Sequence, residues 1–153
     1  MLTNKGKYGL KALAHLAGLE PGQTASIAGI AAAENIPKKF LDAILLDLRN
    51  AGFVRSKKGP GGGVALARAP DEIRLGDVVR SLDGPLAPIG CASRTAFRPC
   101  DDCSDLETCP VRLTMVDVRD AISRVLDTTT LAQMARRSAN ARAWSAGQGG
   151  TGP

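Results

Sequence analysis

Residues 36–68, IPKKFLDAILLDLRNAGFVRSKKGPGGGVALAR, decide the fold that the sequence predicts. After Pro37, which suits the first turn of a helix, four apolar residues recur at helical spacing. They are Leu41, Ile44, Leu45 and Leu48. Gly52 can adopt the left-handed conformation that ends such a helix. Residues 53–66 then read as two short strands joined by a flexible turn, so the stretch predicts a helix followed by a β-hairpin with a basic tip.

A phosphate-binding loop is the competing interpretation of the glycine run at residues 59–63. Such a loop requires a Lys-Ser or Lys-Thr pair that opens a helix. Gly63 is followed by Val64-Ala65-Leu66 instead. The sequence therefore favours the hairpin.

The residues before this stretch complete a three-helix unit. Residues 5–19 carry an apolar stripe at helical spacing, and EPGQT at 20–24 ends it. Ser26 can cap a second helix that runs to Glu34. With a further helix at 75–82, the pattern predicts a mainly α fold with a small β-hairpin wing, a winged helix-turn-helix domain over residues 1–82.

The second half of the chain predicts an appendage. Residues 83–110 lack periodicity and contain all the cysteines, which indicates a functional loop. Residues 111–126 resume a helical pattern with more apolar surface than a small domain needs, and a second copy of the chain could cover it. Thr130 and Gln133 form a capping box for a short helix that ends near Arg142. We therefore expect a cysteine loop at 83–110, a long dimerisation helix and a short C-terminal helix at 111–142, and a disordered tail at 143–153.

Charge is distributed unevenly along the 153 residues, whose net charge is +5 and whose pI is about 9.3. Residues 1–69 hold ten Lys or Arg against four Asp or Glu, whereas residues 70–112 hold five against eight. A basic N-terminal half favours a polyanionic partner. No apolar run has the length of a signal peptide or a membrane span, so we expect a cytoplasmic protein without membrane contact.

The basic residues fall where a winged helix contacts DNA. The second helix of the motif reads bases in the major groove with its N-terminal residues, and the wing reaches phosphates or the minor groove. The candidates are Lys5, Lys38, Lys39, Phe40, Asp42, Arg55, Lys57, Lys58 and Gly61, and Lys7 and Lys11 could add phosphate contacts. The competing interpretations are a solvated charged face and a winged helix that docks a protein.

Four cysteines, Cys91, Cys100, Cys103 and Cys109, follow the spacing C-x8-C-x2-C-x5-C. Zinc sites more often show two CxxC pairs, and ferredoxin spacing is absent. Four thiolates from one chain would complete the ligand set of an iron–sulfur cluster, [2Fe–2S] or [4Fe–4S], while zinc and reactive thiols stay open. The neighbouring carboxylates Asp101, Asp102, Asp105 and Glu107 are expected to raise the thiol pKa values.

The single histidine, His15, lies far in sequence from every cysteine, so a catalytic Cys-His pair is not expected. We therefore expect a structural or surface role for His15, and we expect that the protein is not an enzyme.

Three stretches carry a resemblance to a known family: LTNKGKYGLKAL at 2–13, residues 36–68, and IRLGDVVRSLDG at 73–84. The cysteine loop and the long helix follow them in the same order. The chain resembles the Rrf2 family of bacterial transcription regulators, of the IscR, NsrR and RirA type. The similarity runs from residue 2 to residue 134. It implies a homodimeric winged-helix regulator, expected to be a repressor that binds a palindromic operator in double-stranded DNA. In many members an iron–sulfur cluster lies between the DNA-binding part and the long helix.

The resemblance assigns Cys91, Cys103 and Cys109 to the three cluster cysteines of the family. The fourth ligand of relatives is a histidine, where this chain has Arg112, or an N-terminal carboxylate, where it has Lys7. Cys100 becomes the candidate replacement, with Asp101 or Asp102 as lesser candidates, and Lys58 replaces an arginine that reads the minor groove. Some relatives lack a cluster. The alternatives are therefore a thiol- or zinc-dependent winged-helix regulator and, less expected, a small iron–sulfur electron carrier.

Overall fold

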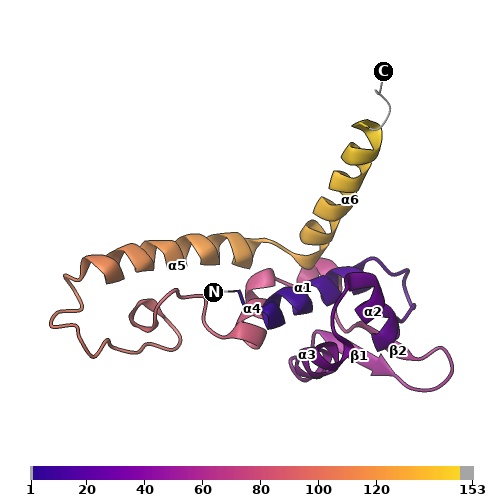
Figure 1. The fold of residues 1–153 in the computed structure, drawn as a ribbon, viewed down its shortest axis with the longest axis horizontal. Coiled ribbons are helices and arrows are strands. Elements are labelled where there is room, and N and C mark those ends of the chain that lie inside the picture. Colours follow the sequence, from indigo (N-terminus) through magenta and orange to yellow (C-terminus); the bar gives the residue numbers. More distant parts are fainter. Residues whose placement is uncertain (1, 149–153) are drawn as a thin grey trace.

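The computed structural model describes residues 2–148, in which six α-helices and one β-hairpin follow one another (Figure 1). In chain order they are α1 (Asn4–Ala17), α2 (Ile27–Glu34), α3 (Lys38–Asn50), β1 (Val54–Lys57), β2 (Gly63–Leu66), α4 (Leu75–Asp83), α5 (Pro110–Thr128) and α6 (Leu131–Gln148), with short 3-10 turns η1 (Pro70–Glu72) and η2 (Gly90–Ala92). Helices α1 to α4 and the hairpin pack into one unit. Helix α5 extends away from this unit, with the cysteine loop beside its N-terminal half.

Polar caps begin α1 and α2, and left-handed residues end α2 and follow α3. The hydroxyl groups of Thr3 and Ser26 accept hydrogen bonds from the backbone at the starts of α1 and α2. Asn35 ends α2 in the left-handed conformation, with φ of 53°. Gly52 has φ of 85° just after α3, which confirms the predicted stop signal.

The hairpin pairs β1 with β2 in antiparallel register, from Val54 opposite Leu66 to Lys57 opposite Gly63. The pairing includes the basic residues Arg55 and Lys57 of β1. Ala25 forms a further bridge with Val64, through backbone hydrogen bonds of 2.9 and 2.8 Å. The wing is thereby fixed to the segment between α1 and α2.

The core lies between α1, α3 and α4, and α6 contributes its first residue. The largest fully buried side chains are Leu13, Ile30, Leu41, Leu48, Ile73, Leu131 and Val78. A methyl group on Gly9 would overlap the side chain of Leu82, so a glycine is needed where α1 approaches α4. By the cost of core truncations, replacing Leu41 with alanine would lower stability by about 2–5 kcal/mol.

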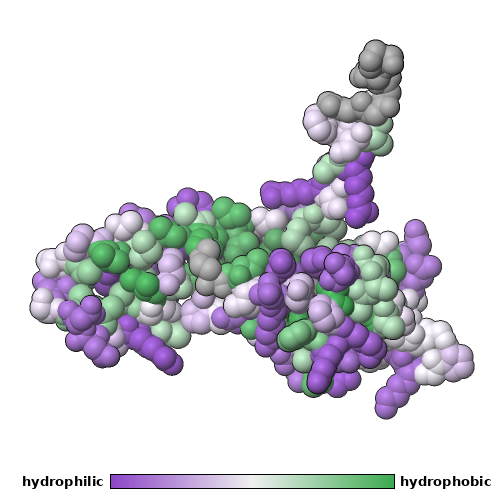
Figure 2. All heavy atoms as spheres, in the orientation of Figure 1, coloured by the Kyte–Doolittle hydropathy of each residue, from purple (hydrophilic) through white to green (hydrophobic). Residues whose placement is uncertain are grey.

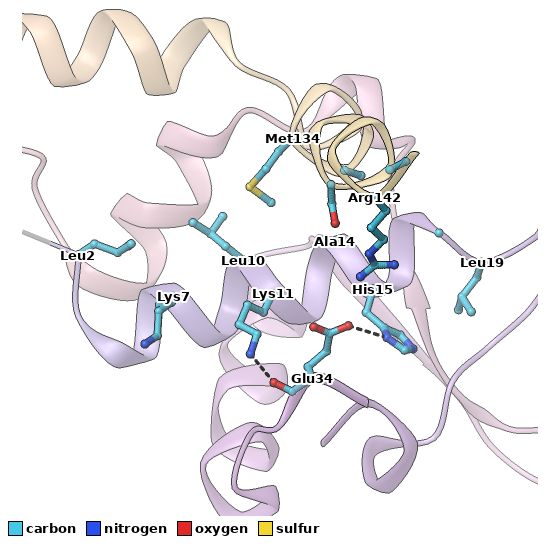
Figure 3. A pocket seen from close by; sticks show the side chains of 14 residues that line it. Leu2, Lys7, Leu10, Lys11, Ala14, His15, Leu19, Glu34, Met134 and Arg142 are labelled. Atoms are coloured by element: carbon cyan, nitrogen blue, oxygen red, sulfur yellow. Dashed lines mark hydrogen bonds and ion pairs between the residues drawn. The ribbon is translucent and has the colours of Figure 1, made fainter. Parts of the chain in front are cut away.

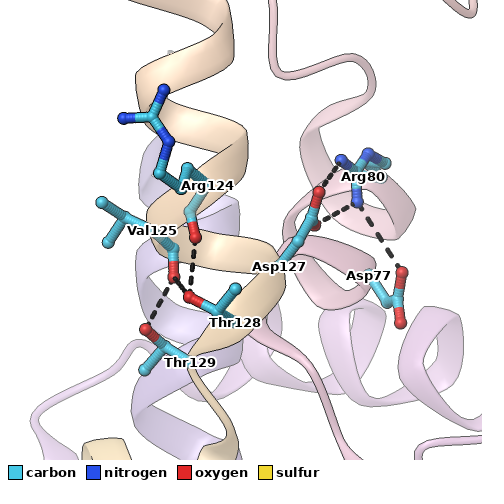
Figure 4. Close-up of polar contacts among 7 residues, drawn as sticks. All are labelled: Asp77, Arg80, Arg124, Val125, Asp127, Thr128 and Thr129. Carbon is cyan, nitrogen blue, oxygen red and sulfur yellow. Dashed lines mark hydrogen bonds and ion pairs between the residues drawn. The ribbon is translucent and has the colours of Figure 1, made fainter.

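The joint between α4 and α5 is a forked ion pair (Figure 4). Arg80 donates from both terminal nitrogens to the two carboxylate oxygens of Asp127, at 2.7 and 2.8 Å, and Asp77 lies 3.7 Å away. A side chain on Gly76 would overlap Asp127, so the pair depends on that glycine. The turn after α5 is also held, because Leu75 N–H donates to Thr129 O at 3.0 Å.

The C-terminal elements differ from the sequence prediction in two ways. Helix α6 ends at Gln148 rather than near Arg142, so it includes residues 143–148 of the tail that the sequence predicts to be disordered, while residues 149–153 lie outside the described residues. The run from 131 to 146 contains several alanines and no glycine or proline, which favours a helix. Helix α5 begins one residue early at Pro110, which places Cys109 at its N-cap. The predicted capping box is confirmed, because Thr130 and Gln133 exchange side chain to backbone hydrogen bonds.

Helix α5 is long but amphipathic. Within residues 2–148 no helix combines the length and the apolar character that crossing a membrane requires.

Replacing Asp127 with asparagine should lower the free energy of unfolding by about 0.5–1 kcal/mol near neutral pH, because both partners are partly exposed. Arg80 holds the pKa of Asp127 below its ordinary value of 3.8, chiefly through their hydrogen bond. The stabilisation is therefore complete above that ordinary value and is lost as the pH falls through the lowered pKa. Urea unfolding of wild type and variant over a pH series measures the difference. Asp117→Asn, an exposed carboxylate of α5, is the control, and a difference that stays constant into the acid range would contradict the assignment.

Candidate DNA interface and cysteine site

Helix α3 separates a buried face from an exposed one. Leu41, Ile44, Leu45 and Leu48 are buried, whereas Lys38, Lys39, Phe40 and Asp42 at its N-terminal end are exposed. Phe40 exposes 64% of its surface, which is unusual for a phenylalanine that serves packing. Lys38 and Asp42 form an ion pair of 3.2 Å along the helix. The exposed end of α3 thus presents cationic, aromatic and carboxylate groups together, as the sequence predicts for a recognition helix.

Lys5 has a partner that the sequence did not indicate. Its amino group lies 2.8 Å from the carboxylate of Asp47, which joins α1 to α3. Both side chains are exposed by 44%, so the pair is open to solvent. A phosphate contact by Lys5 stays a prediction.

The wing presents Arg55, Lys57 and Lys58 on its exposed side. Its tip is held by two contacts, from Thr24 Oγ1 to Gly61 O at 2.8 Å and from Gly62 N–H to Gly59 O at 2.9 Å. Gly61 has φ of 71°, a conformation that side chains disfavour. The tip is therefore a defined turn that carries cationic side chains beside it.

The cysteine loop lies at the opposite end of α5 from α3 and the hairpin (Figure 1). Cys91 is 2% exposed within η2, Cys100 is exposed, and Cys103 and Cys109 are half-buried. The Sγ atoms of Cys91 and Cys100 are 3.6 Å apart. The thiols of Cys103 and Cys109 shift each other's pKa, and the charge of Cys103 contributes to the raised pKa of Cys100. Cys91 and Cys100 are thus in contact, while Cys103 and Cys109 lie further along the same loop.

The thiol pKa values are shifted in different directions at different cysteines. The hydrogen bond with Cys91 raises the pKa of Cys100 to about 11. Removal from water is the main cause that raises the pKa of Cys103. The pKa of Cys109 is lowered instead, chiefly by the backbone N–H of Arg112 at the start of α5. The expectation that carboxylates raise every thiol pKa is wrong for Cys109, where the helix N-terminus outweighs the repulsion from Asp102.

The donor set fits a thiolate-bound metal. Two thiolates on one tetrahedral ion with metal–sulfur bonds near 2.3 Å are about 3.8 Å apart, close to the Cys91–Cys100 separation of 3.6 Å. Cys103 and Cys109 could supply two further thiolates, and two irons with two thiolates each need four. Across residues 2–148, however, no three Cys, His, Asp or Glu side chains are already arranged around one point, so the two pairs would have to close on the group that they bind.

Arginines of α5 hold the loop, and the sequence pattern gave no signal for them. Arg112 Nε donates to Cys91 O at 3.0 Å and its Nη1 to Leu106 O at 3.2 Å. Arg119 Nη1 donates to Ala92 O at 2.6 Å, and Arg94 lies 3.0 Å from Asp120. The two α5 arginines are two helical turns apart and reach consecutive carbonyl groups of η2.

An open groove of about 620 Å³ lies between α1 and α6 (Figure 3). The side chains of Lys11 and His15 are directed toward Glu34, and His15 Nδ1 is 3.0 Å from Glu34 Oε1. His15 therefore links α1 to α2, which agrees with the structural role that the sequence predicts.

The helix pair α2–α3, the hairpin and the exposed cationic end of α3 define a winged helix-turn-helix protein. Residues 2–137 match the Rrf2 family, described as iron-dependent transcriptional regulators, and the chain belongs to that family. An rrf2-like protein of Rhodobacter capsulatus is 43% identical over 137 residues, covering 88% of this chain and 91% of that protein. CymR of Bacillus subtilis is 34% identical over 134 residues, 88% of each chain.

Solved structures agree. The structure of CymR, the global cysteine regulator of B. subtilis, superposes with a TM-score of 0.74 at 33% identity, and the match covers 90% of this chain and 97% of that one. IscR of T. potens gives a TM-score of 0.71 at 28% identity, with 90% and 88% covered. The predicted fold class, family and absence of enzymatic function are confirmed.

In the reduced, metal-free protein, Cys109 should be alkylated by iodoacetamide faster than Cys100 near neutral pH, because only its thiolate is stabilised. Brief labelling in the presence of a chelator, followed by peptide mass spectrometry, measures the order. The difference should shrink at alkaline pH as both thiols ionise. Preferential labelling of the more exposed Cys100 at neutral pH would show that exposure, not thiolate stabilisation, governs the loop.

Proposed function

We propose that the protein is a cytoplasmic homodimeric repressor whose affinity for a palindromic operator is controlled by an iron–sulfur cluster on Cys91, Cys100, Cys103 and Cys109. The observation that carries the proposal is that all four cysteines lie in the loop before α5, with the Sγ atoms of Cys91 and Cys100 3.6 Å apart, in a family described as iron-dependent. The loop contains all four cysteines, so it can supply four soft ligands from one chain.

Helix α5 supports the homodimer. Over its 19 residues it has no fully buried side chain in the described structure, and Val111 and Val125 are each 59% exposed. Figure 2 shows apolar side chains along α5. An apolar face this long favours cover by another helix, and pairing of two copies of α5 about a two-fold axis would supply it. The two α3 helices would then read the half-sites of a palindrome.

When bound, the cluster would supply a redox-sensitive centre whose loss or oxidation changes the charge and the cross-linking of the loop. Cys91 would hold the group from the buried side and Cys109 from the start of α5. Since η2 is bonded to α5 by Arg112 and Arg119, a rearranged loop would change the position of α5. At its other end, the Arg80–Asp127 pair would pass that change to α4 and the DNA-binding unit.

A thiol switch without a cluster is the second candidate, favoured by the same 3.6 Å contact between Cys91 and Cys100. Hydroperoxide could convert one thiolate to a sulfenic acid, and the second thiol could displace water to form a disulfide. Iron-free protein that binds DNA only when reduced would support this candidate.

Anaerobically purified wild type should be coloured and should contain iron and acid-labile sulfide, whereas Cys103→Ala should be colourless. Cys100→Ala tests the fourth ligand: we expect less than half of the wild-type cluster. Full cluster content in Cys100→Ala would exclude Cys100 and favour Asp101 or Asp102. Wild type that holds zinc or no metal, with thiols intact, would contradict the cluster.

Alanine at Lys39 or Phe40 should weaken operator binding by about 1–3 kcal/mol while affecting nonspecific DNA less, because these side chains would face bases. Alanine at Lys57 or Lys58 should weaken both similarly and reduce the slope of log K against log salt by about one. Fluorescence anisotropy over a salt series measures both. Arg137→Ala, an exposed change on α6, is the charge-matched control. Equal losses in the control would show that net charge alone explains binding.

A further inference from the structure

Arg112 connects the two limbs of the cysteine loop. One donor of its guanidinium bonds to the carbonyl of Cys91, in the first limb, and another bonds to the carbonyl of Leu106, in the second. Leu106 lies between Cys103 and Cys109 in the chain. The side chain therefore bridges the segments that carry the two thiol pairs.

The backbone of the same residue contacts the site as well. Arg112 follows Cys109, the N-cap of α5, by three residues, and its backbone N–H lowers the pKa of that thiol. Arg112 is half-buried, so water competes less for the hydrogen bonds of its guanidinium group than it would at an exposed arginine. No other side chain among the described residues is hydrogen-bonded to both limbs.

We propose that Arg112 is a positioning residue for the cysteine site, which holds the two limbs of the loop beside each other before any metal is bound. This rests on the proposed function, because it concerns the same ligands. Arginine occupies the position where the resemblance places a histidine ligand, so the chain replaces one metal ligand by a residue that orders the others and relies on Cys100 for the fourth sulfur.

The planar fork explains why arginine is suited to this role. Its donors point in fixed directions and can serve two carbonyl groups at once, whereas the lysine ammonium is a point charge on a flexible stem. A loop ordered in advance loses less conformational entropy when it binds a metal. Polar partners that orient metal ligands typically change metal affinity by about 10–100-fold when they are removed.

Three variants separate geometry from charge. Arg112→Ala removes the fork and the charge, Arg112→Lys keeps the charge without the fork, and Arg124→Ala removes an exposed charge from the same helix. In reduced, metal-free protein, hydrogen exchange of loop amides such as Ser93 and Arg98 should accelerate about tenfold or more in both Arg112 variants and stay unchanged in Arg124→Ala. Exchange within α1 and α3 should be unchanged in all three, which controls for global unfolding.

Cobalt(II) is the metal probe, because its thiolate absorption reports the ligand set directly. Both Arg112 variants should bind Co²⁺ about 10–100-fold more weakly than wild type and Arg124→Ala. Wild-type exchange and cobalt affinity in Arg112→Ala would overturn the proposal, and wild-type behaviour of Arg112→Lys would overturn the role of the fork. If the wild type binds no cobalt and yields no cluster while Arg112→Ala opens the loop, the proposed function fails but the positioning by Arg112 is supported.

Discussion

The position of α5 depends on polar contacts at its two ends. No side chain along it is fully buried in the described part of the chain, so the core of the winged helix cannot fix its direction alone. At the N-terminal end Arg112 and Arg119 bond to backbone carbonyl groups of η2, and at the C-terminal end Asp127 receives the fork of Arg80. The cysteine loop and the DNA-binding unit are therefore mechanically connected through one helix.

The size of the required coupling is compatible with these contacts. Allosteric coupling energies of about 1–3 kcal/mol change affinity roughly 5–150-fold. A hydrogen bond to a charged group contributes about 1.5–3 kcal/mol, and a partly exposed ion pair somewhat less. Making or breaking one or two arginine contacts at the loop would supply that energy without repacking the core. A dimer would double the effect, because both copies of α5 would respond to their own loops.

The sequence predicts the elements that local chemistry determines and misses those that depend on tertiary contacts. Helical periodicity placed α3 and its exposed end, and Gly52 marked where that helix ends. The sequence pattern also predicted the hairpin. It did not predict the bridge between Ala25 and Val64, because a single pair of residues produces no periodic pattern. Carboxylates beside the cysteines suggested raised thiol pKa values, yet the N-terminus of α5 reverses the direction at Cys109. The sequence showed only that Arg112 stands where relatives have a histidine ligand. The structure adds that it donates hydrogen bonds to the carbonyl groups of Cys91 and Leu106.

Operator affinity measured on one dimer preparation in two states tests the central claim most directly. Anaerobic fluorescence anisotropy would compare cluster-loaded protein with the same protein after cluster removal, with the thiols kept reduced and the dimer confirmed by sedimentation. The account predicts a 5–150-fold difference in the dissociation constant for the operator and little difference for unrelated DNA. Equal operator affinity in the two states would contradict it, because the cysteine loop would then be mechanically separate from the helices that read DNA.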